Sequence, residues 1–521
     1  MKVLNRLVNL ILLLCIPAVL FFFQYLLNVP FNFHSLGFIF ELAVLLVTLA
    51  CLYERFKKRK DKGFRFDTVT YVAIGAIIVM LIGVIAGGPY TGGLNNYKNQ
   101  SVIKEIDFES IPEFDVTQIQ LVDKNTAEQL GDRVFGTLGS DEVSQYAVGD
   151  DWVQISVNGT LYRVTPIDFG SFLKYMATGS TPGYIMVDCE SGDARLVRTE
   201  GMKYMTSAYF SHNLYRHLFF KDPTALFGAA KFELDDDCRP YWIVPVYEMT
   251  WLDKTEDIKG VYVVDPFNGD AQYYDVASVP AWVDNVYPVS VVYRQFAQSK
   301  KYENGLFNWS KKGVVEFTDD YAYVQFNNNV WIYTGVTSVG KDESNVGFAY
   351  IDLRNGEISY IRRAGAEEYS ARSSAEGAVQ QYHYTAIFPS MVSVKGRPTY
   401  FMGLVDGANL IKSYAFVNYE NYQTAATGTT VQEAYDNYLK LIGESAGKDM
   451  DAETVTVSFE VKGLQSYVKD GNTVILYRDE SKEIYWYDLS NGDLSASFIE
   501  IGDLVTVKVK TDKEIVEFVS E

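Results

Sequence analysis

The sequence has few of the residues that carry most enzyme chemistry. It contains four cysteines and four histidines among 521 residues, and no H-E-x-x-H, C-x-x-C, P-loop or G-x-S-x-G motif occurs. His212 and His217 are five residues apart, which puts them on different faces of a helix and argues against a shared metal. We therefore predict no catalytic, cofactor-binding or metal-binding residue and no cofactor. The acidic run Asp235–Asp237 beside Glu233 could supply oxygen ligands to Ca²⁺ or form a solvated loop.

Lysine and arginine are scarce in all but the first part of the chain. Residues 1–67 hold nine Lys/Arg and four Asp/Glu, whereas the remainder has a net charge of −25. A surface this acidic repels phosphate backbones, so we expect no nucleic-acid partner. Aromatic residues are abundant instead, at 15% with 38 Tyr and 32 Phe, and such residues favour β-structure.

The few cysteines fall into two groups. Cys15 and Cys51 lie in apolar stretches and are typical small core residues. Cys189 and Cys238 lie 49 residues apart in the acidic body. They could form a disulfide or both stay free, because sequence spacing does not define the geometry that pairing requires.

Long apolar runs are confined to the first ninety residues. They extend from about Leu7 to Leu27, Leu36 to Tyr53 and Val69 to Ala86. Each is long enough for a helix to cross a hydrocarbon core of about 30 Å. These runs predict three transmembrane helices, with the membrane bilayer as one partner.

Charge in the loops between these runs predicts an orientation. The second loop carries seven Lys/Arg between Arg55 and Arg65, whereas the first loop carries none. Positive loops stay in the cytoplasm, so we expect a multi-pass cell-membrane protein with a cytoplasmic N terminus and an extracytoplasmic body after about Gly88. Glu41 lies within the second run and is a candidate intramembrane polar site, although its carboxyl could also reach the interface.

The body repeats a strand–turn pattern. It reads GYIMVDCESGDA from Gly183, GVYVVDPFNGDA from Gly260 and GFAYIDLRNGEI from Gly347, at spacings of 77 and 87 residues. The shared turn residues are Asp188 with Gly192, Asp265 with Gly269, and Asp352 with Gly356. Asp accepts backbone N–H bonds that start a turn, and Gly provides the positive φ that a return strand needs. Helical patterns nearby predict about four α+β repeats, each an antiparallel meander with one helix.

These units resemble the PepSY domain, a small extracytoplasmic α+β module, through strands such as YVVDPFNGDA at Tyr262 and a nearby helix. The resemblance covers about half of the chain and rests on a short motif. It implies a binding or inhibitory module rather than an enzyme, and it transfers no functional residue.

The last part of the chain has a different pattern. Residues 454–519 alternate strongly in short runs, contain a D-G turn at Asp470–Gly471, and resemble an OB-fold barrel. The expected organisation is a transmembrane region (1–92), a connector and start of the outer body (93–144), the repeats (145–445) and the barrel (446–521).

Together these patterns favour a non-enzymatic, membrane-anchored extracytoplasmic binding or scaffold protein of a bacterial cell envelope. Its expected partners are other membrane or envelope proteins or a cell-wall polymer. Two alternatives remain open: an accessory subunit of a transport, secretion or envelope-assembly complex, and a hydrolase with an unrecognised acidic site. Paired carboxylates in a pocket would favour the hydrolase.

Overall fold

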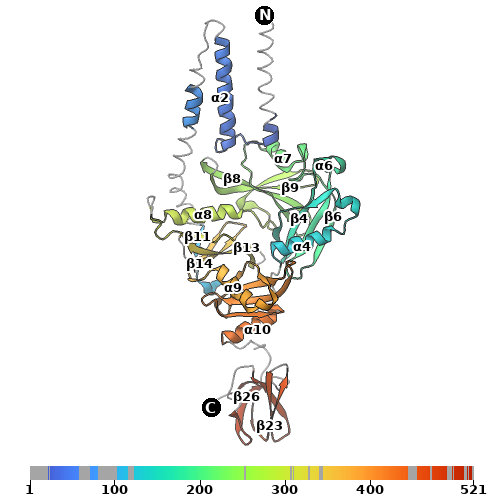
Figure 1. Cartoon of the computed structure of the whole chain (residues 1–521), viewed down its shortest axis with the longest axis vertical. Helices are drawn as coiled ribbons and strands as arrows, with labels where there is room; N and C mark the ends of the chain where they lie inside the picture. Colours follow the sequence, from blue (N-terminus) through green and yellow to red (C-terminus); the bar gives the residue numbers. More distant parts are fainter. Residues whose placement is uncertain are drawn as a thin grey trace. The chain divides into compact units, whose positions relative to one another are not determined.

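The structure is a computed structural model (Figure 1). It describes residues 22, 24–57, 71–79, 102–114, 122–251, 254–304, 308, 310–326, 329–339, 344–443, 455–469, 472–489, 496, 498–509, 513 and 515–518. The chain divides into two compact units, Met1–Ala425 and Ala426–Glu521. The described residues of the first unit form four sheets, in which β1 and β15 pair in parallel and the other pairs given below are antiparallel.

The first sheet has the strand order β2–β4–β5–β6, with β3 also paired to β4. Its strands are β2 (Tyr146–Val148), β3 (Val153–Val157), β4 (Thr160–Phe169), β5 (Thr181–Asp188) and β6 (Ala194–Met202). The helices of this region are α4 (Lys124–Phe135), α5 (Ser140–Val143) and α6 (Phe172–Thr178). Asp123 caps α4 because its side chain accepts the backbone N–H of Thr126.

The second sheet has the order β10–β9–β8–β7. Its strands are β7 (Lys231–Leu234), β8 (Pro240–Trp251), β9 (Lys254–Val264) and β10 (Ala271–Asp275). Three helical segments precede or follow it: η2 (Phe210–His212), α7 (Leu214–Lys221) and η3 (Val276–Ser278).

The third sheet has the order β1–β15–β14–β13–β11, with β12 on β13 and β16 on β14. Its elements are β1 (Ile103–Glu105), β11 (Val315–Phe317), β12 (Ala322–Phe326), β13 (Asn329–Ser338), β14 (Ser344–Asp352), β15 (Ile358–Ile361) and β16 (Gly365–Ala366), with η1 (Phe108–Ser110) and α8 (Val289–Tyr302). β1 pairs with β15 in parallel, so residues far apart in sequence share one sheet.

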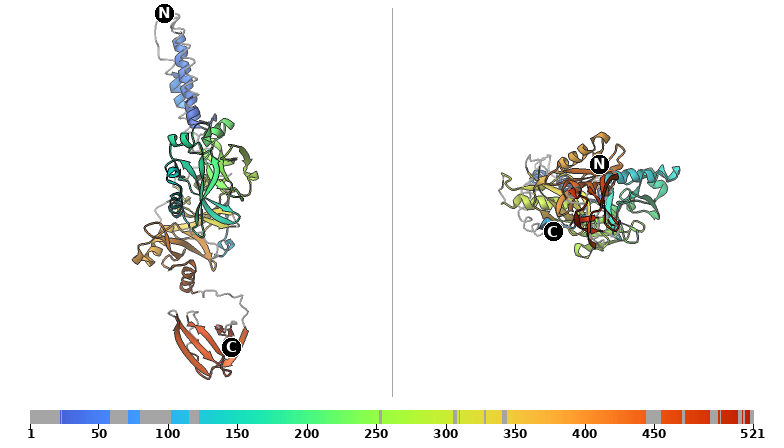
Figure 2. Two further views of the ribbon diagram at one scale, coloured as in Figure 1. Left: turned by 90° about the vertical axis from the view of Figure 1, so that its right-hand side faces the viewer. Right: turned by 90° about the horizontal axis from the view of Figure 1, so that it is seen from below.

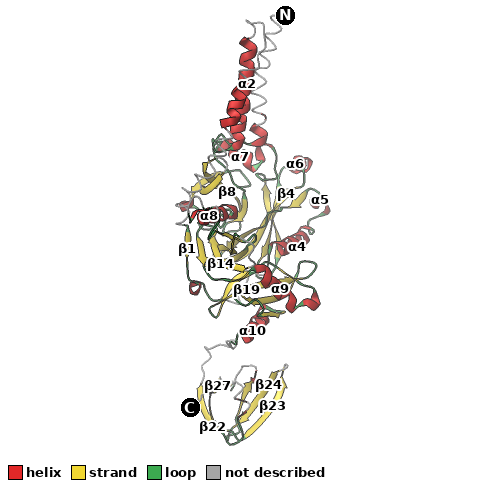
Figure 3. Cartoon of the chain, turned by 60° about the vertical axis from the view of Figure 1, so that its left-hand side comes forward, coloured by secondary structure: helices red, strands yellow, loops and turns green. Residues whose placement is uncertain are grey.

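The fourth sheet is built on β19 (Arg397–Val405), which pairs with β17 (Thr385–Ala386), β18 (Ser390–Val394) and β20 (Ile411–Asn418). Helix α9 (Glu368–Ala378) packs on it, followed by η4 (Gln380–Tyr382). Figure 3 shows the same body as mostly strand, with short helices at its periphery.

Successive sheets share cores of alternating apolar residues. Tyr184 of the first sheet contacts Phe232 of the second at 5.8 Å between ring centroids, within one cluster. The second and third sheets enclose another cluster with α8, and the third and fourth enclose a third with α9. In Figures 1 and 2 the sheets that contain β4 and β9 lie between α2 (Leu36–Lys57) and the sheets that contain β13 and β19.

The three repeated turns share one geometry. Gly192, Gly269 and Gly356 have φ values of +74°, +80° and +74°. In each turn the glycine N–H donates to the carbonyl of the aspartate four residues earlier. The aspartate Oδ1 accepts further backbone N–H groups two or three residues ahead. These turns reverse the chain between neighbouring strands and lie outside the pocket described below.

A pair of glycine substitutions separates backbone strain from steric contact at these turns. Gly192→Ala is expected to destabilise the protein by about 1 kcal/mol because alanine must adopt a positive φ. A Cβ at Gly192 would have no neighbour closer than 4.0 Å, whereas one at Gly269 would lie 2.5 Å from the Tyr204 ring. Gly269→Ala is therefore expected to cost roughly 1–3 kcal/mol more. Urea unfolding measures both, and equal losses would contradict the steric argument.

The predicted membrane anchor is not found. The part of the chain that the structure describes contains no helix long and apolar enough to cross a membrane. The three-span fold class and the multi-pass localisation are therefore wrong. An apolar run is an ambiguous signal, because hydropathy alone does not fix the environment of the helix that it forms. In the described part of the chain Phe40, Val44 and Leu46 of α2 are exposed, whereas Phe31, between the first two runs, packs against Phe219 of α7 at 5.8 Å between ring centroids. Most of the first predicted span (7–21 and 23), the ends of the third (69–70 and 80–86) and most of the basic loop (58–65) lie outside the described residues.

The second unit follows the body of sheets. It contains α10 (Val431–Leu441), which comes after β21 (Ala425–Gly428). Where the sequence predicted an OB-like barrel, the described strands form two three-stranded sheets, β22–β26–β27 and β23–β24–β25. Their bounds are β22 (Val455–Glu460), β23 (Gly463–Lys469), β24 (Asn472–Arg478), β25 (Ile484–Asp488), β26 (Leu504–Val509) and β27 (Ile515–Phe518). Tyr477, Tyr487 and Val507 lie in one core between them.

Candidate functional site

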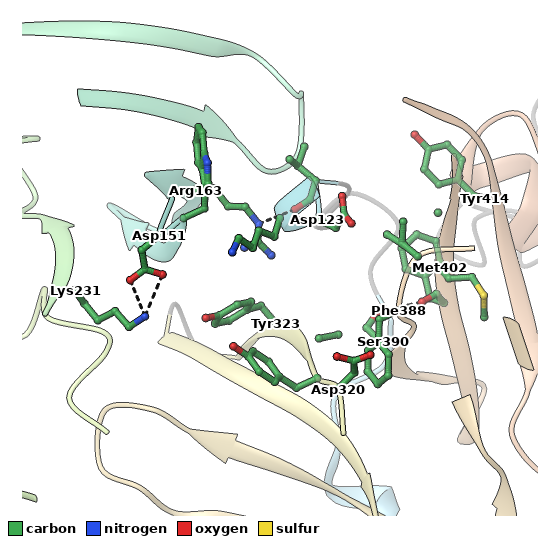
Figure 4. Close-up of a pocket in the computed structure, with 18 residues that line it drawn as sticks. Asp123, Asp151, Arg163, Lys231, Asp320, Tyr323, Phe388, Ser390, Met402 and Tyr414 are labelled. Carbon is green, nitrogen blue, oxygen red and sulfur yellow. Dashed lines mark hydrogen bonds and ion pairs between the residues drawn. The ribbon is translucent and has the colours of Figure 1, made fainter. Parts of the chain in front are cut away.

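One pocket lies where the four sheets of the first unit meet (Figure 4). Its cavity is about 320 Å³ in volume. Each sheet contributes the start of one strand: Asp151 and Trp152 precede β3, Lys231 begins β7, Asp320 and Tyr321 precede β12, and Ser390 begins β18. Contacts of β3 with β7 and β13, and of β12 with β18, bring these strand starts together.

Three carboxylates line the pocket, and the fold uses them differently. Asp123 accepts the Thr126 N–H at 2.8 Å and thereby caps α4. Asp151 forms an ion pair with Lys231 at 2.9 Å. The backbone carbonyl of Asp320 accepts the hydroxyl of Thr334 at 3.1 Å. The Asp320 carboxylate itself has no hydrogen bond or ion pair among the residues that the structure describes.

Aromatic side chains form much of the remaining wall. They are Trp152, Tyr321, Tyr323, Phe388, Phe401 and Tyr414. Tyr321 and Tyr323 contact edge to face at 5.5 Å, and Phe401 stacks with Tyr414 at 6.3 Å. Burial raises the pKa of Tyr323 and of Tyr414, so both hydroxyls stay protonated at neutral pH. The walls thus combine flat apolar faces with hydroxyl and carboxylate groups.

Basic groups complete the lining. Arg163 lies in β4 and is 4% exposed, and Lys124 is the first residue of α4. The Arg163 Nε donates to the Val122 carbonyl at 3.0 Å. A ligand in this pocket therefore meets both signs of charge.

The residues that the sequence analysis singled out lie elsewhere. Cys189 and Cys238 are free thiols. Cys189 is fully buried, and burial raises the pKa of its thiol to about 12, so it is unreactive as a nucleophile at neutral pH. Glu41 lies on α2, where burial raises its pKa. Its predicted intramembrane role depended on the spans corrected above.

The remaining polar candidates also have local partners. His212 shares a hydrogen bond with the Tyr175 hydroxyl at 3.1 Å, and His217 with the Gly269 carbonyl at 2.6 Å. Asp235 organises its own turn by accepting the N–H groups of Asp237 and Arg239. Among the described residues no cluster of ligands that could hold a metal ion is found.

Sequence reasoning missed Asp151, Asp320 and Arg163. A signal for the two aspartates is present: Asp150-Asp151-Trp152 and Asp319-Asp320-Tyr321 each place two acids and an aromatic residue directly before a strand. Arg163 gives no such signal, because it lies inside an ordinary alternating strand.

Comparison with known proteins adds little to this geometry. No protein-family model matches the chain, and no curated protein does. Solved structures that match include an exo-β-1,3-galactanase from Phanerochaete chrysosporium at 9% identity, covering 77% of this chain and 69% of that one. A B. megaterium levansucrase matches at 10% identity over 78% and 97% of the two chains, and a Cellvibrio cellulosa α-L-arabinanase at 11% over 71% and 95%. The TM-score is 0.17 in all three cases, which carries no argument about fold or function.

Two functional interpretations from the sequence are therefore corrected. The PepSY-like repeat interpretation is corrected: no family model matches the chain, and the three repeated turns lie in sheets that differ in strand number and order. The non-enzymatic, membrane-anchored envelope scaffold is also wrong, because the anchor that it required is not found among the described helices. The pocket with its carboxylates is instead the feature that the hydrolase alternative needed.

Proposed function

We propose that the first unit is a hydrolase that cleaves a glycosidic bond in the pocket between its four sheets. The observation that carries the proposal is the presence of Asp151 and Asp320 in one aromatic-lined cavity of about 320 Å³. The two residues come from different sheets, and Figure 4 shows them on different walls. A cavity of this size suits a sugar unit rather than a large apolar ligand.

The aromatic walls support a saccharide as the substrate. A sugar ring has apolar C–H faces and a polar rim of hydroxyl groups. Tyr321, Tyr323 and Phe388 offer flat surfaces for the C–H faces. The carboxylate oxygens of Asp320 and the tyrosine hydroxyls are hydrogen-bond partners for the rim.

Two carboxylates are the groups that glycoside hydrolysis requires. One carboxylic acid protonates the leaving oxygen as the C–O bond breaks. The other carboxylate attacks the anomeric carbon, or it deprotonates the water that attacks. Water is consumed: its hydroxyl stays on the sugar and its proton replaces the one donated to the leaving group. Asp151 and Asp320 are assigned these two roles, and the Lys231 ammonium orients Asp151.

Asparagine substitutions test this assignment. Full-length protein is assayed against a panel of aryl glycosides and oligosaccharides for release of the aglycone or reducing ends. Asp151→Asn and Asp320→Asn are each expected to lower kcat/KM by about 10²- to 10⁴-fold, because each variant lacks a group that transfers a proton or attacks in the transition state.

Asp319→Asn is the matched control, since it removes a neighbouring exposed carboxylate that does not line the pocket. It is expected to leave kcat/KM unchanged. Cleavage that is insensitive to both pocket variants, or no cleavage of any glycoside by the wild-type chain, would overturn the proposed function.

A further inference from the structure

Arg163 is a buried cation whose guanidinium has only part of its hydrogen-bonding capacity satisfied by the fold. It lies in the middle of β4, where its backbone pairs with Gln154 of β3 and Val187 of β5. Its side chain is 4% exposed and lines the pocket. The Nε donates to the Val122 carbonyl at 3.0 Å, and the guanidinium lies 5.1 Å from the centre of the Tyr323 ring. Its two Nη groups have no hydrogen bond or ion pair within the described part of the chain.

Such burial has an energetic cost. A cation removed from water is destabilising unless an anion or several acceptors compensate it. One carbonyl and one aromatic face compensate Arg163 only in part. The carboxylates of the pocket do not compensate this charge among the described residues: Asp151 pairs with Lys231, Asp123 caps α4, and Asp320 forms no ion pair with Arg163. An anionic ligand in the pocket would complete the compensation.

A second cation lines the same cavity. Lys124 is the first residue of the twelve-residue helix α4, directly after the capping Asp123. Its side chain is exposed and forms no ion pair among the described residues. The pocket therefore has two positively charged side chains: Arg163, which is buried and held by packing, and Lys124, which is exposed.

We propose that the pocket selects a saccharide that carries a carboxylate, such as a uronic acid, with Arg163 as the residue that binds the carboxylate and Lys124 as a supporting cation. This specificity rests on the proposed glycoside hydrolysis and names its substrate class. The planar guanidinium, with its two Nη groups available, matches the two oxygens of a carboxylate. A phosphate would bring a second negative charge close to Asp123, Asp151 and Asp320 and is therefore disfavoured.

Calorimetric titration of the full-length chain tests the proposal with three probes: glucuronic acid, glucose and glucose 6-phosphate. Glucuronic acid is expected to bind more tightly than the other two. Arg163→Gln is expected to weaken glucuronic acid by about 10- to 100-fold, because a hydrogen-bonded charge pair is lost. The same substitution is expected to leave glucose binding unchanged. Arg163→Lys keeps the charge but not the planar fork, and an intermediate loss is expected.

Controls separate recognition from folding. Arg198→Gln removes an exposed arginine that pairs with Glu142 at 2.6 Å outside the pocket, and it should change no affinity. Lys124→Gln alters an exposed side chain and should weaken glucuronic acid several-fold with an unchanged melting temperature. This second variant keeps the proposal testable if Arg163→Gln fails to fold.

The outcomes also distinguish this inference from the proposed function. Arg163-dependent binding of glucuronic acid without cleavage of any glycoside would refute hydrolysis and uphold the acidic ligand. Cleavage of neutral glycosides with equal affinity for glucose and glucuronic acid would uphold hydrolysis and refute the acidic ligand. Preference for glucose 6-phosphate would refute the carboxylate assignment.

Discussion

Replacing Glu233 by alanine is expected to lower the free energy of unfolding by about 3–5 kcal/mol at pH 7. Glu233 is fully buried in β7, between Phe232 and Leu234, which pack into the cluster shared by the first and second sheets. Its two carboxylate oxygens accept the backbone N–H groups of Asp284 and Asn285, each at 2.9 Å. Alanine would leave both donors unsatisfied where no bulk water reaches, and it would open a cavity as well.

Asp284→Asn is the matched variant, and its expected effect has the opposite sign. Burial, and then the charge of Glu233, raise the pKa of Asp284, so the two carboxylates disfavour each other's ionised form. Asparagine removes that repulsion while its carbonyl oxygen still accepts the Ser156 N–H, which Asp284 accepts at 2.6 Å. We expect this variant to be at least as stable as the wild type at pH 7. Urea unfolding of both variants measures the difference, and equal destabilisation would contradict the account.

Asp168 is expected to make the stability of the first sheet depend on pH. Burial raises its pKa from 3.8 to about 6, opposed in part by the hydrogen bond that the Ser207 hydroxyl donates to it at 2.7 Å. Well below the unfolded-state pKa of about 3.9 the group is protonated in both the folded and the unfolded chain. Between about pH 4 and pH 6 only the unfolded chain ionises, so stability falls as pH rises. The total loss attributable to this group is about 3 kcal/mol by linkage.

Asp168→Asn isolates this contribution. The asparagine carbonyl can still accept the Ser207 hydroxyl, but the residue has no charge to bury. We expect the variant to gain up to about 3 kcal/mol at pH 7 and to show no change near pH 3.5. Asp193→Asn replaces an exposed carboxylate on the β5–β6 turn, at the opposite end of β4 from Asp168, and serves as the control. Unfolding curves measured from pH 3.5 to pH 8 would refute the account if both variants kept the slope of the wild type.

The candidate site shows which of its features a local sequence pattern can predict and which it cannot. The paired acids before an aromatic residue, at Asp151 and at Asp320, are visible in the sequence. Their meeting in one pocket is not, because it depends on how four sheets pack. The role of Arg163 could not be predicted for a related reason. Its position in an alternating strand shows only that it is polar, whereas its contacts with Val122 and Tyr323 arise from tertiary packing.

For the apolar runs the sequence led to a wrong prediction rather than to a missed one. Composition alone cannot distinguish a helix in lipid from one covered by protein, because both environments select the same side chains. Phe31, in the segment between the first two runs, contacts Phe219, and hydropathy does not predict that tertiary contact. The same limit applies to Glu233, which belongs to an acidic stretch in the sequence but is fully buried in the structure.

The sequence by itself determined the local features of this protein: acidic charge, alternating strands, and turns in which an aspartate and a positive-φ glycine reverse the chain. These follow from interactions between residues only a few positions apart. Only the tertiary structure decided which strand starts meet, which carboxylates stay accessible and which arginine is left without a counter-ion. Those properties depend on contacts between residues far apart in the sequence, such as Arg163 with Val122 at 41 positions and Lys231 with Asp151 at 80 positions, and no local pattern specifies them.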